Sequence, residues 1–136
     1  MRWLDRLPHQ PPMRLLEDVV DVIAGESAVG RRTAAASDFY FQGHFPDLPV
    51  VPAIILIEML AQTGGIAAAS ADTSSVRPGL RVAATGPFKF PAAAGPGARL
   101  EARARVAGRL GRMFKIEGEV SADGRVVAVG SLTLAG

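Results

Sequence analysis

A histidine and a glutamate, fourteen positions apart, carry the side chains that acid–base chemistry needs. His44 lies in the run Gly-His-Phe-Pro, where a neutral imidazole would be able to accept a proton. Glu58 interrupts an apolar stretch, and burial there would favour the neutral carboxyl group, which has a proton to donate. Each residue also has a simpler interpretation. A lone histidine more often bonds a buried backbone group, and a lone carboxylate more often pairs with an arginine.

The helix expected after Pro52 adds a third functional group. The first N–H groups of a helix have no partner inside it and lie at the positive end of its dipole. Ala53 and Ile54 are therefore predicted to donate their N–H groups to a carbonyl oxygen, which would stabilise an enolate-like transition state. Base, acid and donors together indicate removal of a proton beside a carbonyl, followed by loss of a β-hydroxyl group.

The helix that carries Glu58 is predicted over Ala53–Ala69, with a weak point at Gly64 and Gly65. Glu58 and Gln62 are four positions apart and so share one face. The remaining positions of the helix are apolar on nearly every side, which is typical of a buried helix.

Alternating apolar and polar residues predict strands on both sides of this helix. Asp123-Gly124 is a strong hairpin signal. The predicted strands span residues 15–22, 28–36, 100–106, 115–120 and 126–133, with a loop at 72–79 and turns near Gly25, at 94–97 and at 108–111. We therefore predict one α+β domain over residues 1–136, in which an antiparallel β-sheet wraps a central buried helix.

Composition excludes several classes of protein and site. The chain has 136 residues and no cysteine, which excludes disulfide scaffolds and thiolate metal sites. No apolar run resembles a signal peptide or is long enough to span a bilayer, so we expect a cytoplasmic protein without a membrane partner. A net charge of +2 with one Trp and one Tyr is not typical of nucleic-acid binding.

The run from Phe41 to Gln62 resembles the signature of the bacterial 3-hydroxyacyl-[acyl-carrier-protein] dehydratases of the dehydratase-only type. That family has a Gly-His-Phe-Pro run, a Pro-Val-x-Pro approach to the helix and a Leu-x-x-Glu-x-x-Ala-Gln motif on it. The spacing from His44 to Glu58 matches without a gap. Residues 7–12, 88–91 and 97–100 also resemble family motifs, so the similarity covers essentially the whole chain.

The resemblance implies a hot-dog fold, a homodimer and in some members a trimer of dimers. It implies that His44 is the base at C2 and that Glu58 of the neighbouring subunit assists departure of the C3 hydroxyl group. The substrate would be a 3-hydroxyacyl thioester on an acyl carrier protein, used in fatty acid or related acyl-chain synthesis, with no metal or other cofactor. We expect Gly43, Phe41 and Gln62 to bind this substrate together with the helix start.

The sequence departs from the family pattern at three places. Ala53 replaces the glycine at the helix start, Ser37-Asp38 replaces Asn-Glu before the aromatic residues, and Gln10 replaces an arginine. These departures would suit a pathway-specific relative, such as one that serves a polyene chain. Ala53 and Ser37-Asp38 also leave open a non-catalytic partner subunit of an active dehydratase. A second alternative is a hot-dog acyl thioesterase, although the complete histidine-to-glutamate signature counts against it.

Two further features have expected roles outside the reaction. His9 lies in a proline-rich segment and is interpreted as structural. One face of a predicted strand carries three arginines, Arg99, Arg103 and Arg105, and we predict that they dock the acidic carrier protein. Such a row of charged residues is more often simply the solvent-exposed face of a strand.

Overall fold

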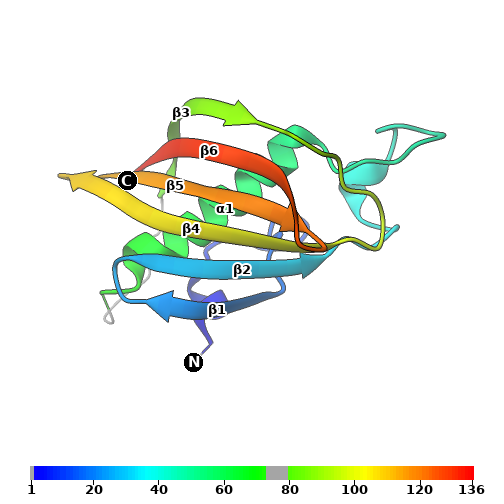
Figure 1. Cartoon of the computed structure of the whole chain (residues 1–136). Helices are drawn as coiled ribbons and strands as arrows, with labels where there is room; N and C mark the ends of the chain where they lie inside the picture. The colour runs from blue at the N-terminus through cyan, green and yellow to red at the C-terminus, as the bar shows by residue number, and fades with distance from the viewer. Residues whose placement is uncertain (1, 73–79) are drawn as a thin grey trace.

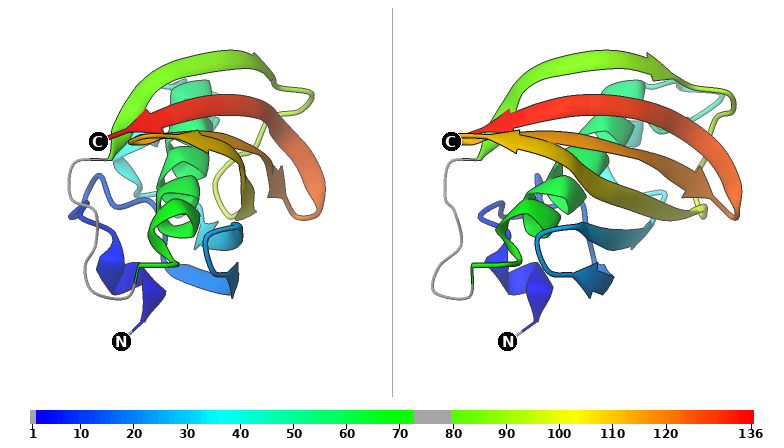
Figure 2. Two further views of the ribbon diagram at one scale, coloured as in Figure 1. Left: turned by 90° about the vertical axis from the view of Figure 1, so that its left-hand side faces the viewer. Right: turned by 60° about the vertical axis from the view of Figure 1, so that its left-hand side comes forward.

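The computed structural model describes residues 2–72 and 80–136 and consists of one long helix packed against one antiparallel sheet. The sheet has six strands in the order β1-β2-β4-β5-β6-β3 and curves around helix α1 (Figures 1 and 2). The elements are η1 (Trp3–Arg6), β1 (Asp18–Ile23), β2 (Ser27–Thr33), η2 (Phe39–Phe41), α1 (Ala53–Ala69), β3 (Arg81–Lys89), β4 (Arg99–Leu110), β5 (Met113–Ala122) and β6 (Arg125–Ala135). This confirms the predicted α+β class and its hot-dog arrangement.

Residues along β4 alternate between buried and exposed, which shows which face of the sheet packs on the core. Leu100, Ala102 and Ala104 are buried beneath it, whereas Arg99 and Arg103 point outward. The strand is longer than predicted.

The predicted turn over residues 108–111 is too long, because β4 continues past a bulge. Gly108 still pairs with Lys115 across the ladder, and the turn is confined to residues 111 and 112.

The hairpin predicted at Asp123-Gly124 joins β5 to β6, and both residues have the positive φ angles that such turns require. The first two strands are shorter than predicted. Leu15 and Leu16 are buried but precede β1, and β2 ends at Thr33. Of the loop predicted over residues 72–79, all but residue 72 lies outside the described residues.

Helix α1 has the predicted bounds and continues without interruption through its two glycines, and a lower local stability at this pair stays a prediction. Gly64 faces β5 closely, since a Cβ atom there would lie 2.6 Å from the Ile116 side chain. The helix is not buried along its whole length, however. Ala53 is exposed and Ile54 is 73% exposed, so the first turn of α1 is uncovered in the single chain. None of the described helices has the length and hydropathy of a membrane-spanning segment.

Candidate active site

The loop that carries His44 is closed by its own backbone. The Val50 N–H donates to the His44 carbonyl oxygen over 2.9 Å, and Phe45 and Leu48 exchange N–H to carbonyl bonds of 3.1 Å. The imidazole Nδ1 lies 3.1 Å from the Val50 carbonyl oxygen. Because a carbonyl oxygen only accepts hydrogen bonds, Nδ1 must carry the proton in this contact. The Nε2 atom of His44 is then left with a lone pair, as a general base requires.

A partly buried ionic cluster fixes the chain just before this loop. Asp38 accepts hydrogen bonds from the Arg32 guanidinium group, from the Tyr40 hydroxyl group at 2.6 Å and from the Ala35 N–H. Burial disfavours ionisation of Asp38, but the hydrogen bonds from Arg32 and Tyr40 outweigh it and lower its pKa. Burial and the Asp38 contact raise the pKa of Tyr40 to about 12. Asp38, one of the departures from the family pattern, thus anchors η2.

Glu58 is held by two side chains from different parts of the chain. Its Oε2 atom accepts a hydrogen bond of 2.9 Å from Gln62, which also donates to the Met13 carbonyl oxygen over 2.7 Å. The same oxygen lies 3.4 Å from Nε2 of His9. The side-chain amide oxygen of Gln62 accepts a hydrogen bond from the Leu15 N–H. The Gln62 side chain therefore ties the N-terminal segment to α1. Gln62 thus orients Glu58 in the single chain, and its predicted contact with substrate stays a prediction.

The start of α1 has the free donors that the sequence predicts. Pro52 precedes the helix and provides no side-chain cap, and the Val51 N–H donates to the Ala94 carbonyl oxygen over 2.8 Å. Within residues 2–72 and 80–136, neither the Ala53 N–H nor the Ile54 N–H has a hydrogen-bond acceptor. Both groups are therefore available to an oxygen atom from outside the chain.

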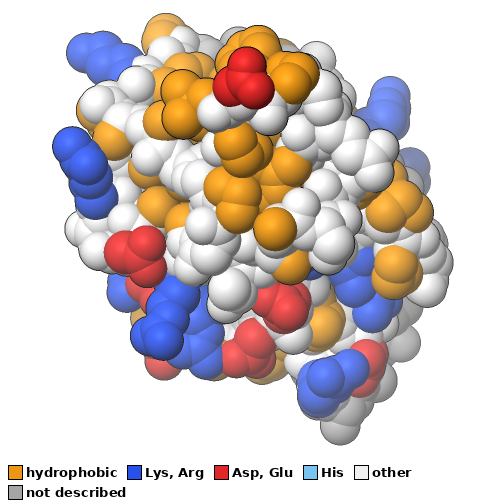
Figure 3. All heavy atoms as spheres, turned by 90° about the vertical axis from the view of Figure 1, so that its right-hand side faces the viewer, with side chains coloured by type: hydrophobic (Ala, Val, Ile, Leu, Met, Phe, Trp, Pro, Cys, Tyr) orange, Lys and Arg blue, Asp and Glu red, His pale blue; other side chains and the backbone are white. Residues whose placement is uncertain are grey.

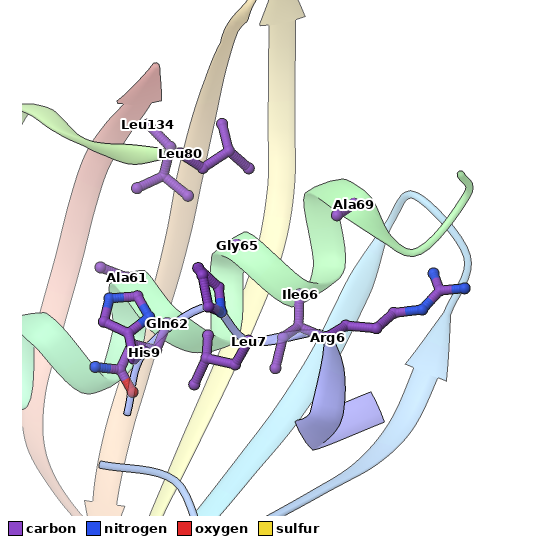
Figure 4. Close-up of a pocket in the computed structure, with 11 residues that line it drawn as sticks. Arg6, Leu7, His9, Ala61, Gln62, Gly65, Ile66, Ala69, Leu80 and Leu134 are labelled. Carbon is purple, nitrogen blue, oxygen red and sulfur yellow. The ribbon is translucent and has the colours of Figure 1, made fainter. Parts of the chain in front are cut away.

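An apolar pocket lies beside Glu58, between the N-terminal segment and α1 (Figure 4). Its interior has a volume of only about 30 Å³, and the space around it that opens to solvent brings the total to about 430 Å³. His9 and Gln62, the two contacts of Glu58, lie near each other at one end, and Leu80 and Leu134 approach from the sheet. Its other lining residues are Arg6, Leu7, Pro8, Ala61, Gly65, Ile66 and Ala69.

Two predicted substrate-binding residues lie away from this pocket. Phe41 is buried in the core against Tyr40, so it has no open surface for a ligand in the single chain. Gly43 has a φ of +77° and open space where a Cβ atom would project. Their contact with substrate stays a prediction.

The single chain does not bring His44 and Glu58 together. Within the described residues, the polar contacts of Glu58 are with His9 and Gln62, whereas the His44 ring bonds Val50 and stacks on Phe45. The loop and the helix start belong to the right-hand end of Figure 1, and hydrophobic side chains gather on that face in Figure 3. The most exposed of its large apolar residues are Phe45, Leu48 and Ile54.

Two of the three arginines of β4 that the sequence offers for carrier docking are paired with acidic residues in the structure. Arg103 pairs with Glu101 and Arg105 pairs with Glu117, so the outer face of the sheet has mixed charge. Docking of an acidic carrier protein on these arginines stays a prediction. The paired glutamates reduce the net positive charge that would attract such a carrier. The described residues contain no group of three or more His, Cys, Asp or Glu side chains that would hold a metal ion.

Sequence reasoning missed the contact between His9 and Glu58. The only signal was the Leu-Pro-His run near the N-terminus, which by itself does not indicate what the ring contacts. The partner is 49 positions away, and nothing in the local pattern joins the two residues.

Comparison with known proteins extends these observations. Residues 7–131 match the model of the FabA-like domain. A 3-hydroxyacyl-[acyl-carrier-protein] dehydratase FabZ from Oleidesulfovibrio alaskensis is 35% identical over 134 residues, covering 97% of this chain and 86% of that protein. The FabZ of Campylobacter lari is 34% identical over 129 residues, covering 93% of this chain and 88% of that protein.

Solved structures share the fold at lower identity. The dehydratase heterocomplex ApeI:P from Xenorhabdus doucetiae has a TM-score of 0.84 at 22% identity, covering 99% of this chain and 90% of that one. The PaaI protein of E. coli, from the phenylacetic acid degradation operon, has a TM-score of 0.66 at 16% identity, covering 88% of this chain and 82% of that one.

Proposed function

Since this chain belongs to the FabA-like family, we propose that it is a FabZ-type dehydratase that converts a 3-hydroxyacyl thioester on an acyl carrier protein into the trans-2-enoyl thioester. His44 is the base and Glu58 the acid. The observation that carries this assignment is the hydrogen bond between His44 Nδ1 and the Val50 carbonyl oxygen, which leaves Nε2 free to accept a proton. The reaction belongs to cytoplasmic fatty acid synthesis or the synthesis of a related acyl chain.

The steps balance with the two side chains alone. His44 Nε2 removes a proton from C2, and the electrons of the C2–H bond form the C2–C3 double bond. The C3–O bond breaks, and the proton of Glu58 joins the departing hydroxyl group to give water. The two residues then exchange one proton through solvent, and the enzyme returns to its initial state.

The start of α1 stabilises the charge that develops on the thioester oxygen. The N–H groups of Ala53 and Ile54 lack acceptors, and they lie at the positive end of the helix dipole. Ala53 supplies the same backbone donor as the family's glycine. Its Cβ atom adds bulk beside the thioester.

The acyl chain would enter at the apolar pocket of Figure 4, whose interior of about 30 Å³ must widen to take it. His9 and Gln62 line it and both contact Glu58, so a chain in the pocket would begin close to the acid. The small residues Ala61, Gly65 and Ala69 leave room along one side of α1.

A second copy of this chain completes each active site. Within one chain His44 and Glu58 make no contact, and apolar side chains are exposed beside both, most of all Ile54. Strand β3 is an edge strand with mostly exposed residues, which leaves one side open for pairing. A two-fold dimer would cover these surfaces, and further assembly into a trimer of dimers is compatible with it.

The test is an assay of dehydration, and of the reverse hydration, with three single variants. We expect His44→Ala and Glu58→Gln each to lower turnover by about 10²–10⁴-fold, since each removes one acid–base group. The exposed carboxylate variant Glu26→Gln is the matched control and should retain activity. Turnover near the wild-type value in either site variant would remove that residue from the mechanism. Hydrolysis of the thioester by the wild type would instead identify a thioesterase, and no reaction would identify a non-catalytic subunit.

A further inference from the structure

Of the two polar contacts that Glu58 makes within the described residues, His9 is the one with an ionisable ring, and the reaction steps above assign it no role. Its Nε2 atom lies 3.4 Å from Glu58 Oε2, and the two side chains are 29% and 26% exposed. This distance exceeds that of a good hydrogen bond, but catalytic contacts of unliganded enzymes are often long and shorten when substrate binds. His9 also lines the apolar pocket, so the ring lies between the acid and the expected position of the acyl chain.

The backbone on both sides of His9 is fixed by specific hydrogen bonds. The Arg14 guanidinium group donates to the carbonyl oxygens of His9, over 3.0 Å, and Leu7, over 3.4 Å. Gln62 holds the following segment through the Met13 carbonyl oxygen and the Leu15 N–H. Because the segment is anchored at these points, the ring has little freedom to move away from Glu58.

The environment of the other ring nitrogen selects one tautomer. Nδ1 of His9 is buried and has no hydrogen-bond partner among the described residues. A proton on Nδ1 would be a buried donor without an acceptor, and this arrangement is rare because it costs about 1–3 kcal/mol. A proton on Nε2 faces Glu58 Oε2 instead. In the neutral ring the proton is therefore favoured on Nε2 rather than on Nδ1.

We propose that His9 is a positioning residue whose Nε2–H, together with the Gln62 amide, holds Oε2 of Glu58 as an acceptor so that Oε1 carries the reactive proton. Gln62 already donates to Oε2, and an Nε2–H of His9 closing the 3.4 Å gap would be a second donor, which leaves no space for a proton on that oxygen. A neutral donor also differs from a cation, which would favour the ionised carboxylate that has no proton to give. This inference rests on the proposed role of Glu58 as the acid.

Two amide substitutions separate this role from a structural one. The amide nitrogen of a glutamine at position 9 can occupy the place of Nε2, whereas that of an asparagine occupies the place of Nδ1. We expect His9→Asn and His9→Ala to lower kcat by about 10–100-fold through misplacement of the acid, with little change in KM. His9→Gln should recover most of kcat. Equal kcat values for the Gln and Asn variants, or a loss confined to KM, would overturn the proposal.

A second measurement needs no active enzyme and no substitution of His9. The sequence contains two histidines, so ¹⁵N NMR of the rings gives two sets of signals, and a His44→Gln variant identifies those of His9. We expect a neutral His9 ring protonated on Nε2 near neutral pH. Protonation on Nδ1, or a charged ring, would contradict the proposal. If the wild type does not dehydrate the substrate, the proposed function fails, but this spectrum still tests the state of His9.

Discussion

At the scale of single residues, Asp38 makes the most concentrated set of polar contacts near the site. It bonds Arg32, Tyr40 and the Ala35 N–H, and its side chain is 9% exposed. The family pattern has a longer acidic residue there, and the shorter Asp38 still reaches both partners. None of these side chains takes part in the proposed reaction steps. Its effect is to fix the segment from which the His44 loop begins.

We predict that Asp38→Asn lowers the free energy of unfolding by about 2–3 kcal/mol at neutral pH, because it weakens hydrogen bonds to a charged group. The pKa of Asp38 is lower in the folded protein than its ordinary value of 3.8. A lowered folded pKa stabilises the protein above pH 3.8, and this contribution is lost as the pH falls through the folded pKa. Urea unfolding at a series of pH values should show the wild type and the variant converging in acid. A constant difference across that range would contradict this account.

At the scale of elements, the two adjacent glycines of α1 have different surroundings. Gly64 faces β5, where a Cβ atom would lie 2.6 Å from Ile116. Gly65 borders the pocket, and the nearest atom to its Cβ position belongs to Leu134, at 3.9 Å. The sequence pair that indicated a weak point thus allows close packing at one position and preserves pocket space at the other.

We predict opposite changes in stability for alanine at these two positions. Gly64→Ala should destabilise the fold by about 1–3 kcal/mol through overpacking, which outweighs its gain in helix propensity. Gly65→Ala should stabilise it by up to about 1 kcal/mol. Since its methyl group narrows the pocket, Gly65→Ala should also raise KM for long acyl chains more than for short ones. Thermal unfolding and a series of acyl lengths measure both effects, and equal destabilisation by the two variants would contradict the packing assignment.

At the scale of the whole molecule, the proposed site requires two chains. Glu58 faces the N-terminal segment of its own chain, whereas the His44 ring belongs to a loop beside the uncovered first turn of α1. A two-fold axis beside paired helices would bring each His44 to the Glu58 of its partner, twice in each dimer.

We predict that a refolded mixture of His44→Ala and Glu58→Gln chains regains roughly a quarter of wild-type activity. Random association makes about half of the dimers hybrids, and each hybrid holds one intact site and one site with both lesions. Differently tagged chains, recovered together, provide the control for reassociation. If hybrids form and the mixture is still inactive, both residues of a site come from the same chain.

The sequence by itself determined the helix, the alternating strands and the hairpin, and it predicted the pairing of a base with an acid. These depend on local periodicity, turn chemistry and a motif that is continuous from His44 to Glu58. Only the tertiary structure brought His9 to Glu58 and Asp38 to Arg32, because these contacts depend on the path that the chain takes between its elements. The mixed charge on β4 was hidden for the same reason. One acidic partner of its arginines, Glu117, comes from the neighbouring strand.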